Sequence, residues 1–314
     1  MKRYSAKRSK IFLWLKILII LIVVVVLGME AFFYLYLNGV TKPGKKTVSI
    51  TPSMLLLESI NVEIMTKDGV KLNGWLLPNK KSNKVILMLH GYASNKADLL
   101  NLSSRINALG YNLLLVDLRG CGESAGDRTY MGAKEVMDVQ AALTYILNDN
   151  RLKASTIAIW ADDMSAYASI LAVEKYPEVK LLMLNNIYPS ALFYLKEKMA
   201  LPFSMPKEIS DFFIYQNVKY LLQFNPDEND LHQILPKIQG RALIFFQTKM
   251  PQYDYVKELY QISPERKELV QLVRVGAEAL QSPDWEMYFN VIKQKLNLYF
   301  PPAEDGSPVV TLGK

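Results

Sequence analysis

The sequence predicts an α/β protein, with a mostly parallel central sheet and helices on both faces, preceded by one transmembrane helix. Strand-length apolar runs alternate with helix-length amphipathic segments from residue 60 to residue 300. A single long apolar segment lies near the N-terminus. Hydrophobic residues make up 50% of the 314 residues, so a sizeable core can form even without that segment.

The apolar segment, IFLWLKILIILIVVVVLGMEAFFYLYL, covers residues 11–37, and only Lys16 and Glu30 in it are charged. It exceeds the roughly 20 residues that an α-helix needs to cross a hydrocarbon core of about 30 Å. A cleaved signal peptide would have an apolar region of about 7–15 residues and a cleavage site of small residues. This run instead continues into aromatic residues, which suit a membrane interface. We therefore expect an uncleaved anchor over residues 11–38.

Basic residues are concentrated in the N-terminal tail, which explains most of the formal net charge of +7. The tail precedes the apolar segment with five Lys and Arg, against three shortly after it. This bias favours a cytoplasmic tail over residues 1–10 and a single-pass membrane protein whose large domain is extracytoplasmic. Because the charge forms a tail and no basic groove, we expect no nucleic-acid partner.

Metal and thiol chemistry have little support in the composition. Cys121 is the single cysteine, and His90 and His232 are the two histidines. An intramolecular disulfide and a cysteine-based zinc site are therefore excluded, Cys121 is expected to be a passive small residue, and no cofactor is expected. A cation site is a minor alternative. It would use four carboxylates: Asp162, Asp163, Glu278 and Asp284.

After a polar linker over residues 39–59, the predicted elements follow in a regular order. Residues 61–78 are typical of a hairpin with a Lys-Asp-Gly turn. Strands and helices then alternate: strand 84–92, helix 96–109, strand 111–120, helix 131–147, strand 156–160, helix 164–174, strands 179–186, 241–246 and 268–275, and helix 283–300. Residues 187–237 interrupt this alternation with aromatic-rich pieces that indicate a small helical cap, and residues 301–314 indicate a loose tail.

Three sequence motifs stand in a fixed order within this alternation: VILMLHGYASNKADL, VDLRGCGESAGD and DLHQILPKIQGRALIFF. Together they resemble the α/β-hydrolase superfamily, in its membrane-anchored, serine aminopeptidase-like branch. The first resembles the His90-Gly91 oxyanion loop. The second resembles an Asp-x-Arg-Gly-x-Gly-x-Ser loop, made here by Asp117, Arg119, Gly120, Gly122 and Ser124. The resemblance covers residues 60–300 and implies the α/β-hydrolase fold there.

The same resemblance implies a catalytic triad in the chain order Ser, Asp or Glu, His. This sequence departs from the pattern at all three positions. The nucleophile position, in a strand–turn–helix stretch, falls on Asp163; the acid position falls on Met250, and the histidine position on Ala279. The backbone N–H groups of Tyr92 and Met164 correspond to the oxyanion hole of an active relative.

Substitutes for the missing triad are few. Asp163 could act as an aspartate nucleophile, as in haloalkane dehalogenases and epoxide hydrolases, but no histidine follows His232 to activate water. Ser165 has no histidine partner either, and Asp254 would be a displaced acid without a base. His90 belongs to the oxyanion loop and is expected to be structural. An ionised Asp163 beside the oxyanion hole would fill it or repel an oxyanion.

We therefore expect a membrane-anchored α/β-hydrolase-fold protein that lacks conventional serine hydrolase activity and acts by binding a ligand or a partner. An active esterase, lipase or peptidase that uses Asp163 or another nucleophile is the alternative, and a purely structural partner domain is a third. The cap residues 188–216 could recognise a small acyl or peptide ligand or simply pack on the sheet. The sequence identifies no protein partner.

Overall fold

A computed structural model describes residues 2–79, 82–199, 201–202, 204–248, 254–272 and 283–302. The chain divides into two compact units. The first comprises Met1–Val40 and Lys198–Pro226, and the second comprises Thr41–Glu197 and Asp227–Lys314. The predicted cap is thus shared between the units, because its central part groups with the N-terminal helix.

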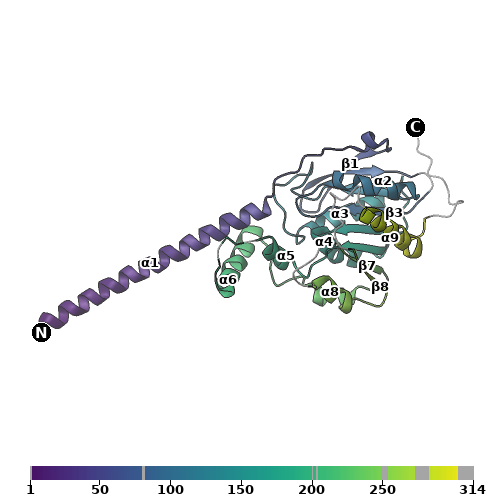
Figure 1. The fold of residues 1–314 in the computed structure, drawn as a ribbon. Helices are drawn as coiled ribbons and strands as arrows, with labels where there is room; N and C mark the ends of the chain where they lie inside the picture. The colour runs from purple at the N-terminus through teal and green to yellow at the C-terminus, as the bar shows by residue number, and fades with distance from the viewer. Residues whose placement is uncertain are drawn as a thin grey trace. The chain divides into compact units, whose positions relative to one another are not determined.

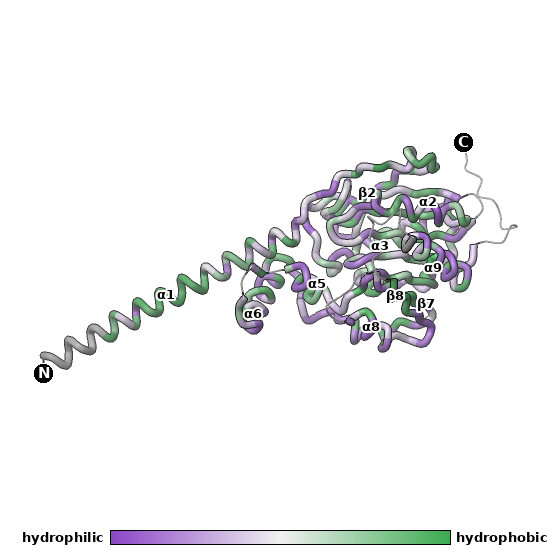
Figure 2. Tube along the Cα trace, viewed as in Figure 1, coloured by the Kyte–Doolittle hydropathy of each residue, from purple (hydrophilic) through white to green (hydrophobic). Residues whose placement is uncertain are grey.

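The first unit is built on helix α1, Lys2–Thr41, which is continuous over 40 residues. Its segment Ile11–Thr41 has a mean hydropathy of 3.1 in its most apolar window and is long and apolar enough to cross a membrane. Figure 2 shows the hydrophobic colour running along this helix. The predicted apolar span is therefore confirmed as one uninterrupted helix.

Helix α6, Lys207–Asn217, and the π-helical turn η4, Val218–Leu222, complete the first unit. The ring of Phe213 stacks on that of Phe33 with a centroid separation of 5.3 Å. The Asn217 side-chain amide donates a hydrogen bond to the Glu30 carboxylate at 2.9 Å. One aromatic contact and one polar contact therefore tie α6 to the C-terminal part of α1.

The second unit contains the sheet (Figure 1). In the described residues its strands are β1 Ile60–Met65, β2 Lys71–Leu77, β3 Val85–Leu89, β4 Asn112–Val116, β5 Ile157–Asp162, β6 Val179–Asn185, β7 Ala242–Gln247 and β8 Lys267–Gln271. Their order is β1-β2-β4-β3-β5-β6-β7-β8. The pairs β1/β2 and β2/β4 are antiparallel and the remaining pairs are parallel. The predicted hairpin and mostly parallel sheet are confirmed.

The helices of the second unit follow the predicted alternation. They are η1 Pro52–Leu55, η2 Lys96–Leu99, α2 Leu100–Ala108, α3 Glu135–Asn148, α4 Met164–Ala172, η3 Val173–Lys175, α5 Ala191–Lys198, α7 Leu231–Ile234, η5 Leu235–Lys237, α8 Tyr255–Ile262 and α9 Pro283–Tyr299. α5 ends at the boundary between the units. The segment predicted as one helix over 96–109 begins as a 3₁₀ turn, because Asn95 and Asp98 form a capping box there.

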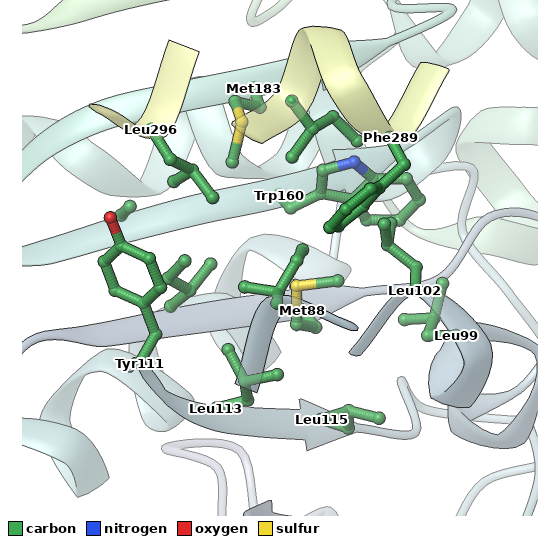
Figure 3. Close-up of a cluster of buried hydrophobic side chains, with 14 of the residues drawn as sticks. Met88, Leu99, Leu102, Tyr111, Leu113, Leu115, Trp160, Met183, Phe289 and Leu296 are labelled. Carbon is green, nitrogen blue, oxygen red and sulfur yellow. The ribbon is translucent and has the colours of Figure 1, made fainter. Parts of the chain in front are cut away.

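Both faces of the sheet are covered. Ile86 and Met88 of β3 belong to a buried cluster with residues of α2 and α9, including Leu102 and Phe289 (Figure 3). Side chains alternate along a strand, so the other residues of β3 point to the opposite face, and they are fully buried too. Helix α3 contacts β3 as well as β1. Helices therefore pack on both faces, as the continuous apolar runs predicted.

Candidate functional site

Asp163 lies in a tight turn between β5 and α4, with φ 50° and ψ −115°. A positive φ at a residue other than glycine is uncommon and is found mainly where the surrounding structure enforces it. Ser165 enforces this turn: its hydroxyl accepts a hydrogen bond from the Asp162 N–H at 3.0 Å and lies 3.1 Å from the Leu89 carbonyl, to which it can donate. The fully buried Ser165 is thus a structural residue of the turn.

The Asp163 carboxylate is buried and hydrogen-bonded. It is 5% exposed, and its Oδ2 accepts a hydrogen bond from the Tyr194 hydroxyl of α5 at 3.0 Å. Burial and the nearby Asp163 charge raise the pKa of Tyr194 well above its ordinary value, so the phenol keeps the proton that it donates. The Tyr194 ring is held in place by stacking on Tyr188, with centroids 4.1 Å apart.

The two neighbouring carboxylates lie against the His90-Gly91 turn. A Cβ atom added to Gly91 would come within 2.9 Å of Asp162 Oδ2 and 3.2 Å of Asp163 Oδ2. Only glycine therefore fits at position 91 without a shift of these side chains. Both carboxylates therefore lie directly against the backbone of Gly91.

Polar side chains that follow β6 and β7 extend the site. The Asn186 amide donates to Asp162 Oδ1 at 3.2 Å and to Thr248 Oγ1 at 2.8 Å. The Thr248 N–H donates to Asn186 Oδ1 at 3.1 Å. The sequence reasoning missed Asn186, Thr248 and Tyr194. The sequence could have indicated Asn186 and Thr248, because each directly follows a strand of the parallel sheet. Residues at the carboxyl ends of parallel strands meet at one edge of the sheet.

A second hydrogen-bond chain connects β5, β6 and α9. The Trp160 indole N–H donates to the Tyr288 hydroxyl at 3.1 Å, and this hydroxyl donates to Asn185 Oδ1 at 2.5 Å. Burial raises the pKa of Tyr288 far above its ordinary value. Tyr288 therefore stays protonated and fixes α9 beside the carboxyl ends of the strands.

A pocket of about 290 Å³ opens above these residues. Its lining combines acidic side chains with aromatic and aliphatic ones, including Asp98, Asp162, Asp163, Leu99, Leu102, Trp160, Trp285 and Tyr288. Among the described residues that line it, none belongs to the predicted cap over 187–237. The described walls of this pocket thus come from the loop that follows β3, the ends of the strands and α9.

Comparisons with known proteins identify the fold of the sheet unit. Residues 80–219 match the sequence model of the family "Serine aminopeptidase, S33". An esterase from Pyrococcus furiosus superimposes with a TM-score of 0.62 at 21% identity, over 82% of this chain and 98% of that one. This chain is an α/β-hydrolase-fold protein. The predicted resemblance is confirmed.

Curated relatives of this α/β-hydrolase-fold protein match part of it. Protein bem46 of Schizosaccharomyces pombe is 26% identical over 169 residues, which is 51% of this chain and 56% of the relative. The alpha/beta hydrolase domain-containing protein WAV2 of Arabidopsis thaliana is 28% identical over 155 residues, 48% of this chain and 50% of the relative. The match thus spans about half the length of these relatives.

The Asp-x-Arg-Gly-x-Gly-x-Ser loop of this α/β-hydrolase-fold protein is a structural brace. Asp117 accepts hydrogen bonds from the Lys96 N–H at 2.7 Å, the Lys96 ammonium at 2.6 Å and the Glu123 N–H at 2.9 Å. The Lys96 ammonium also lies 4.6 Å from the centroid of the Trp75 ring. Both Asp117 and Lys96 are fully buried, and their ion pair holds this loop against η2, which begins at Lys96.

The other residues of this loop have comparable roles. Arg119 forms ion pairs with Asp68 and Asp138, each at 2.7 Å. The Ser124 hydroxyl donates to the Asp117 carbonyl at 2.5 Å. Gly120 and Gly122 both have positive φ, and a Cβ atom on either would clash with Arg128 or Asp117. None of these residues lines the pocket at Asp163.

His90 is held between two backbone groups. Its Nε2 accepts a hydrogen bond from the Leu118 N–H at 3.0 Å, so its Nδ1 carries the proton and donates to the Gly91 carbonyl at 2.8 Å. Complete burial lowers the pKa of His90, which keeps the ring neutral. Cys121 is also inert, because burial raises the pKa of its thiol to about 12.

His232 lies in a separate pocket. Its Nδ1 is 2.7 Å from Asp230 Oδ1, and its Nε2 is 3.1 Å from Glu258 Oε1. This pocket of about 630 Å³ is also lined by Asp254 and Phe193. Neither His232 nor Asp254 lines the pocket at Asp163, so the structure does not bring together these two candidate substitutes with Asp163.

Several predicted site residues lie outside the described part of the chain. Met250, Ala279 and Glu278 are among them, and the side chain of Asp284 is not described either. Within the described ranges, no group of His, Cys, Asp and Glu side chains could hold a metal ion. Tyr92 lines the pocket at Asp163, and Met164 is the first residue of α4, directly after the Asp163 turn.

Proposed function

We propose that this α/β-hydrolase-fold protein lacks conventional serine hydrolase activity and binds a ligand in the pocket at Asp163. Asp163, Met250 and Ala279 would take the three triad positions, and the N–H groups of Tyr92 and Met164 the oxyanion-hole positions. The observation that carries this proposal is the backbone of Asp163, which has the strained conformation of a nucleophile turn while its side chain is a buried, hydrogen-bonded carboxylate.

The electrostatics of the pocket oppose acyl transfer. An acyl-transfer transition state develops negative charge, and an oxyanion hole stabilises it with hydrogen-bond donors. Here Asp162 and Asp163 carry their carboxylates beside Gly91 in the same turn region. Repulsion between these carboxylates and an oxyanion would raise the barrier instead of lowering it.

The same charges favour a particular ligand. Asp98 in the pocket wall is already paired with Lys46, whose ammonium lies 2.7 Å from Asp98 Oδ1. A ligand with a free amine or several N–H groups would therefore be bound by Asp162 and Asp163, which also line the pocket. Its apolar part would pack against Leu102 and Trp285. A carboxylate-bearing acyl ligand would be repelled. We therefore assign the pocket to a small amine or a peptide amino terminus.

Activity measurements on the purified chain test the loss of catalysis. We expect no turnover of short-chain p-nitrophenyl esters above a heat-treated control and no labelling by a fluorophosphonate probe. Asp163→Ser alone should restore little, because loss of a triad histidine alone costs about 10⁶ in kcat. The triple change Asp163→Ser, Met250→Asp, Ala279→His should restore more. Ester turnover that Asp163→Ala abolishes would instead establish an aspartate nucleophile.

That aspartate nucleophile is the second candidate function. It is favoured by the strained turn at Asp163, which presents a nucleophile in active enzymes of this fold. An ester formed on Asp163 would need a base to hydrolyse it. Neither histidine of the chain lines this pocket, since His90 is buried between backbone groups and His232 lines another. For this reason we place ligand binding first.

Ligand binding is tested by thermal unfolding with leucine amide and with hexanoate. Leucine amide should raise the unfolding temperature, and hexanoate should not, because only the first carries a cationic amine. Asp162→Asn should weaken the effect of leucine amide. If hexanoate raised the unfolding temperature and leucine amide did not, the pocket would be assigned to an acyl ligand.

We further propose that α1 is an uncleaved, single-pass anchor with residues 1–10 in the cytoplasm and residues 40–314 outside. A signal sequence near the N-terminus can also form a long apolar helix, but the contacts of Phe33 and Glu30 with α6 favour retention. Cleavage after the apolar run would remove both partners. Protease added to intact cells should digest the large domain, and protection until permeabilisation would reverse the orientation.

A further inference from the structure

We propose that α6 lies in the headgroup layer of the membrane, with Ile209, Phe212 and Tyr220 inserted among the lipids. This rests on the anchoring of α1 proposed above. It uses contacts inside the unit that contains both α1 and α6.

The α6 segment exposes three large apolar or aromatic side chains. Ile209 is 42% exposed, Phe212 57% and Tyr220 76%. Ile209 and Phe212 lie one turn apart on one side of α6, and Tyr220 follows in the π-helical turn. Phe213 and Ile214 form the buried side of the same helix. A second apolar surface opposite a buried one indicates a partner.

Contacts with α1 determine the level of α6 along that helix. Every residue of α1 from Ile11 to Gly28 is exposed, and burial begins with the next residue. Phe213 stacks on Phe33, and Asn217 donates to Glu30. α6 therefore packs directly beyond the C-terminal end of the fully exposed stretch of α1.

The length of α1 places this level at a membrane interface. At 1.5 Å per residue, Ile11–Gly28 is about 27 Å long, close to the hydrocarbon thickness of about 30 Å. Trp14 and Phe33 are about 29 Å apart along the helix axis, the separation of the two aromatic belts of a spanning helix. Since Phe213 stacks on Phe33, α6 lies at the depth of the second belt.

The charges of this segment suit the same environment. Lys207 and Lys219 are exposed near the two ends of the segment, and the exposed Glu208 and half-buried Asp211 lie between them, so the charges of residues 207–222 cancel. Lysine side chains at an interface extend their ammonium groups toward lipid phosphates while aromatic and aliphatic neighbours enter the acyl boundary. A phospholipid surface therefore complements both the apolar and the basic side chains of α6.

Spin labelling of the full chain in vesicles of phosphatidylcholine and phosphatidylglycerol tests this placement. Cys121→Ser leaves no other thiol, so a label can be attached at Phe212→Cys, and separately at Ile209→Cys in case the first variant folds poorly. Val24→Cys marks the middle of the stretch between Trp14 and Phe33, and Glu174→Cys marks an exposed site on η3. Labels on α6 should collide several-fold less with a water-soluble nickel complex, and more with oxygen, than the label at position 174.

The outcomes separate the two proposals. If the label at position 24 is in water, the anchoring and the α6 placement both fail. If that label is in lipid while both α6 labels behave like the one at position 174, the α6 placement fails and the anchoring stands. Dipolar broadening at position 212 that disappears on dilution with unlabelled chain would also overturn the placement, because α6 would then face a second copy.

Discussion

At the scale of single residues, Asp163 combines a strained backbone with a satisfied side chain. Its φ of 50° is typical of a turn that presents a side chain, but the carboxylate is buried and accepts a hydrogen bond from Tyr194. A largely buried acceptor depends strongly on the hydrogen bonds that it receives. The Asp163–Tyr194 pair should therefore contribute measurably to stability.

Tyr194→Phe should lower the free energy of unfolding by about 1–3 kcal/mol, the usual cost of removing a hydrogen-bond donor from a buried acceptor. In an Asp163→Asn background the loss should be smaller, because the acceptor is then neutral. Urea titration of the four chains of this double-mutant cycle measures the coupling. Tyr220→Phe, at an exposed position, is the control and should change little. Equal losses in both backgrounds would contradict a specific pair.

Alanine substitutions at two glycines with positive φ distinguish the cost of backbone strain from the cost of a steric clash. A Cβ atom on Gly122 would lie 2.2 Å from Asp117 Oδ2, whereas one on Gly69 meets nothing within 4 Å. Gly69→Ala should therefore cost only about 1 kcal/mol of backbone strain. Gly122→Ala should be far more destabilising or prevent folding, since the buried Asp117–Lys96 pair cannot move aside. Denaturation midpoints of both variants test this, and equal midpoints would exclude the clash.

At the scale of elements, His232 connects α7 to α8 through Asp230 and Glu258. Burial lowers the pKa of His232, but the two carboxylates outweigh it and raise the pKa above its ordinary value of 6.5. A raised folded-state pKa means that this contribution to stability is fully present below pH 6.5 and is lost as the pH rises through the folded-state pKa. The junction of α7 and α8 is thus expected to weaken toward alkaline pH.

Hydrogen exchange should detect this weakening. After correction for intrinsic rates, α8 amides should be less protected at pH 8 than at pH 5.5, and protection in β3 should change little. His232→Gln should remove most of the pH dependence in α8, because glutamine does not titrate. An unchanged pH dependence in that variant would show that another group is responsible.

At the scale of the whole molecule, the N-terminal helix also serves as a packing partner. Removing residues 1–39 would take away Phe33 and Glu30, the partners of Phe213 and Asn217 in α6. The sheet has its own buried cluster and should stay folded without them.

A chain without residues 1–39 should therefore give a folded sheet unit with a loosened segment at 198–226. Limited proteolysis with mass spectrometry should locate the first cuts in that segment. Phe33→Ala in the full chain, kept in detergent, should increase cutting at the same place. First cuts in the sheet unit would contradict its independence from α1.

Local patterns made most of the fold predictable. Apolar runs and amphipathic periodicity located the elements, and the turn at Asp163 followed from a strand–turn–helix stretch. Strand ends were less predictable: the strand expected over 111–120 ends at Val116, and the next residue, Asp117, bonds to β2 through its N–H and to Lys96 through its carboxylate. The helix expected from 131 begins at Glu135, whose carboxylate accepts the N–H groups of Tyr130 and Gly132.

The sequence by itself determined the alternation of strands and helices, the apolar span and the acidic residue in the turn, because each depends on neighbouring residues. Tertiary structure alone decided which groups meet. Asp163 and Tyr194 are 31 residues apart, Asn186 and Thr248 are 62 apart, and Glu30 and Asn217 are 187 apart. No local pattern encodes such pairings, since they arise only when strand order and helix packing bring distant segments within hydrogen-bond reach.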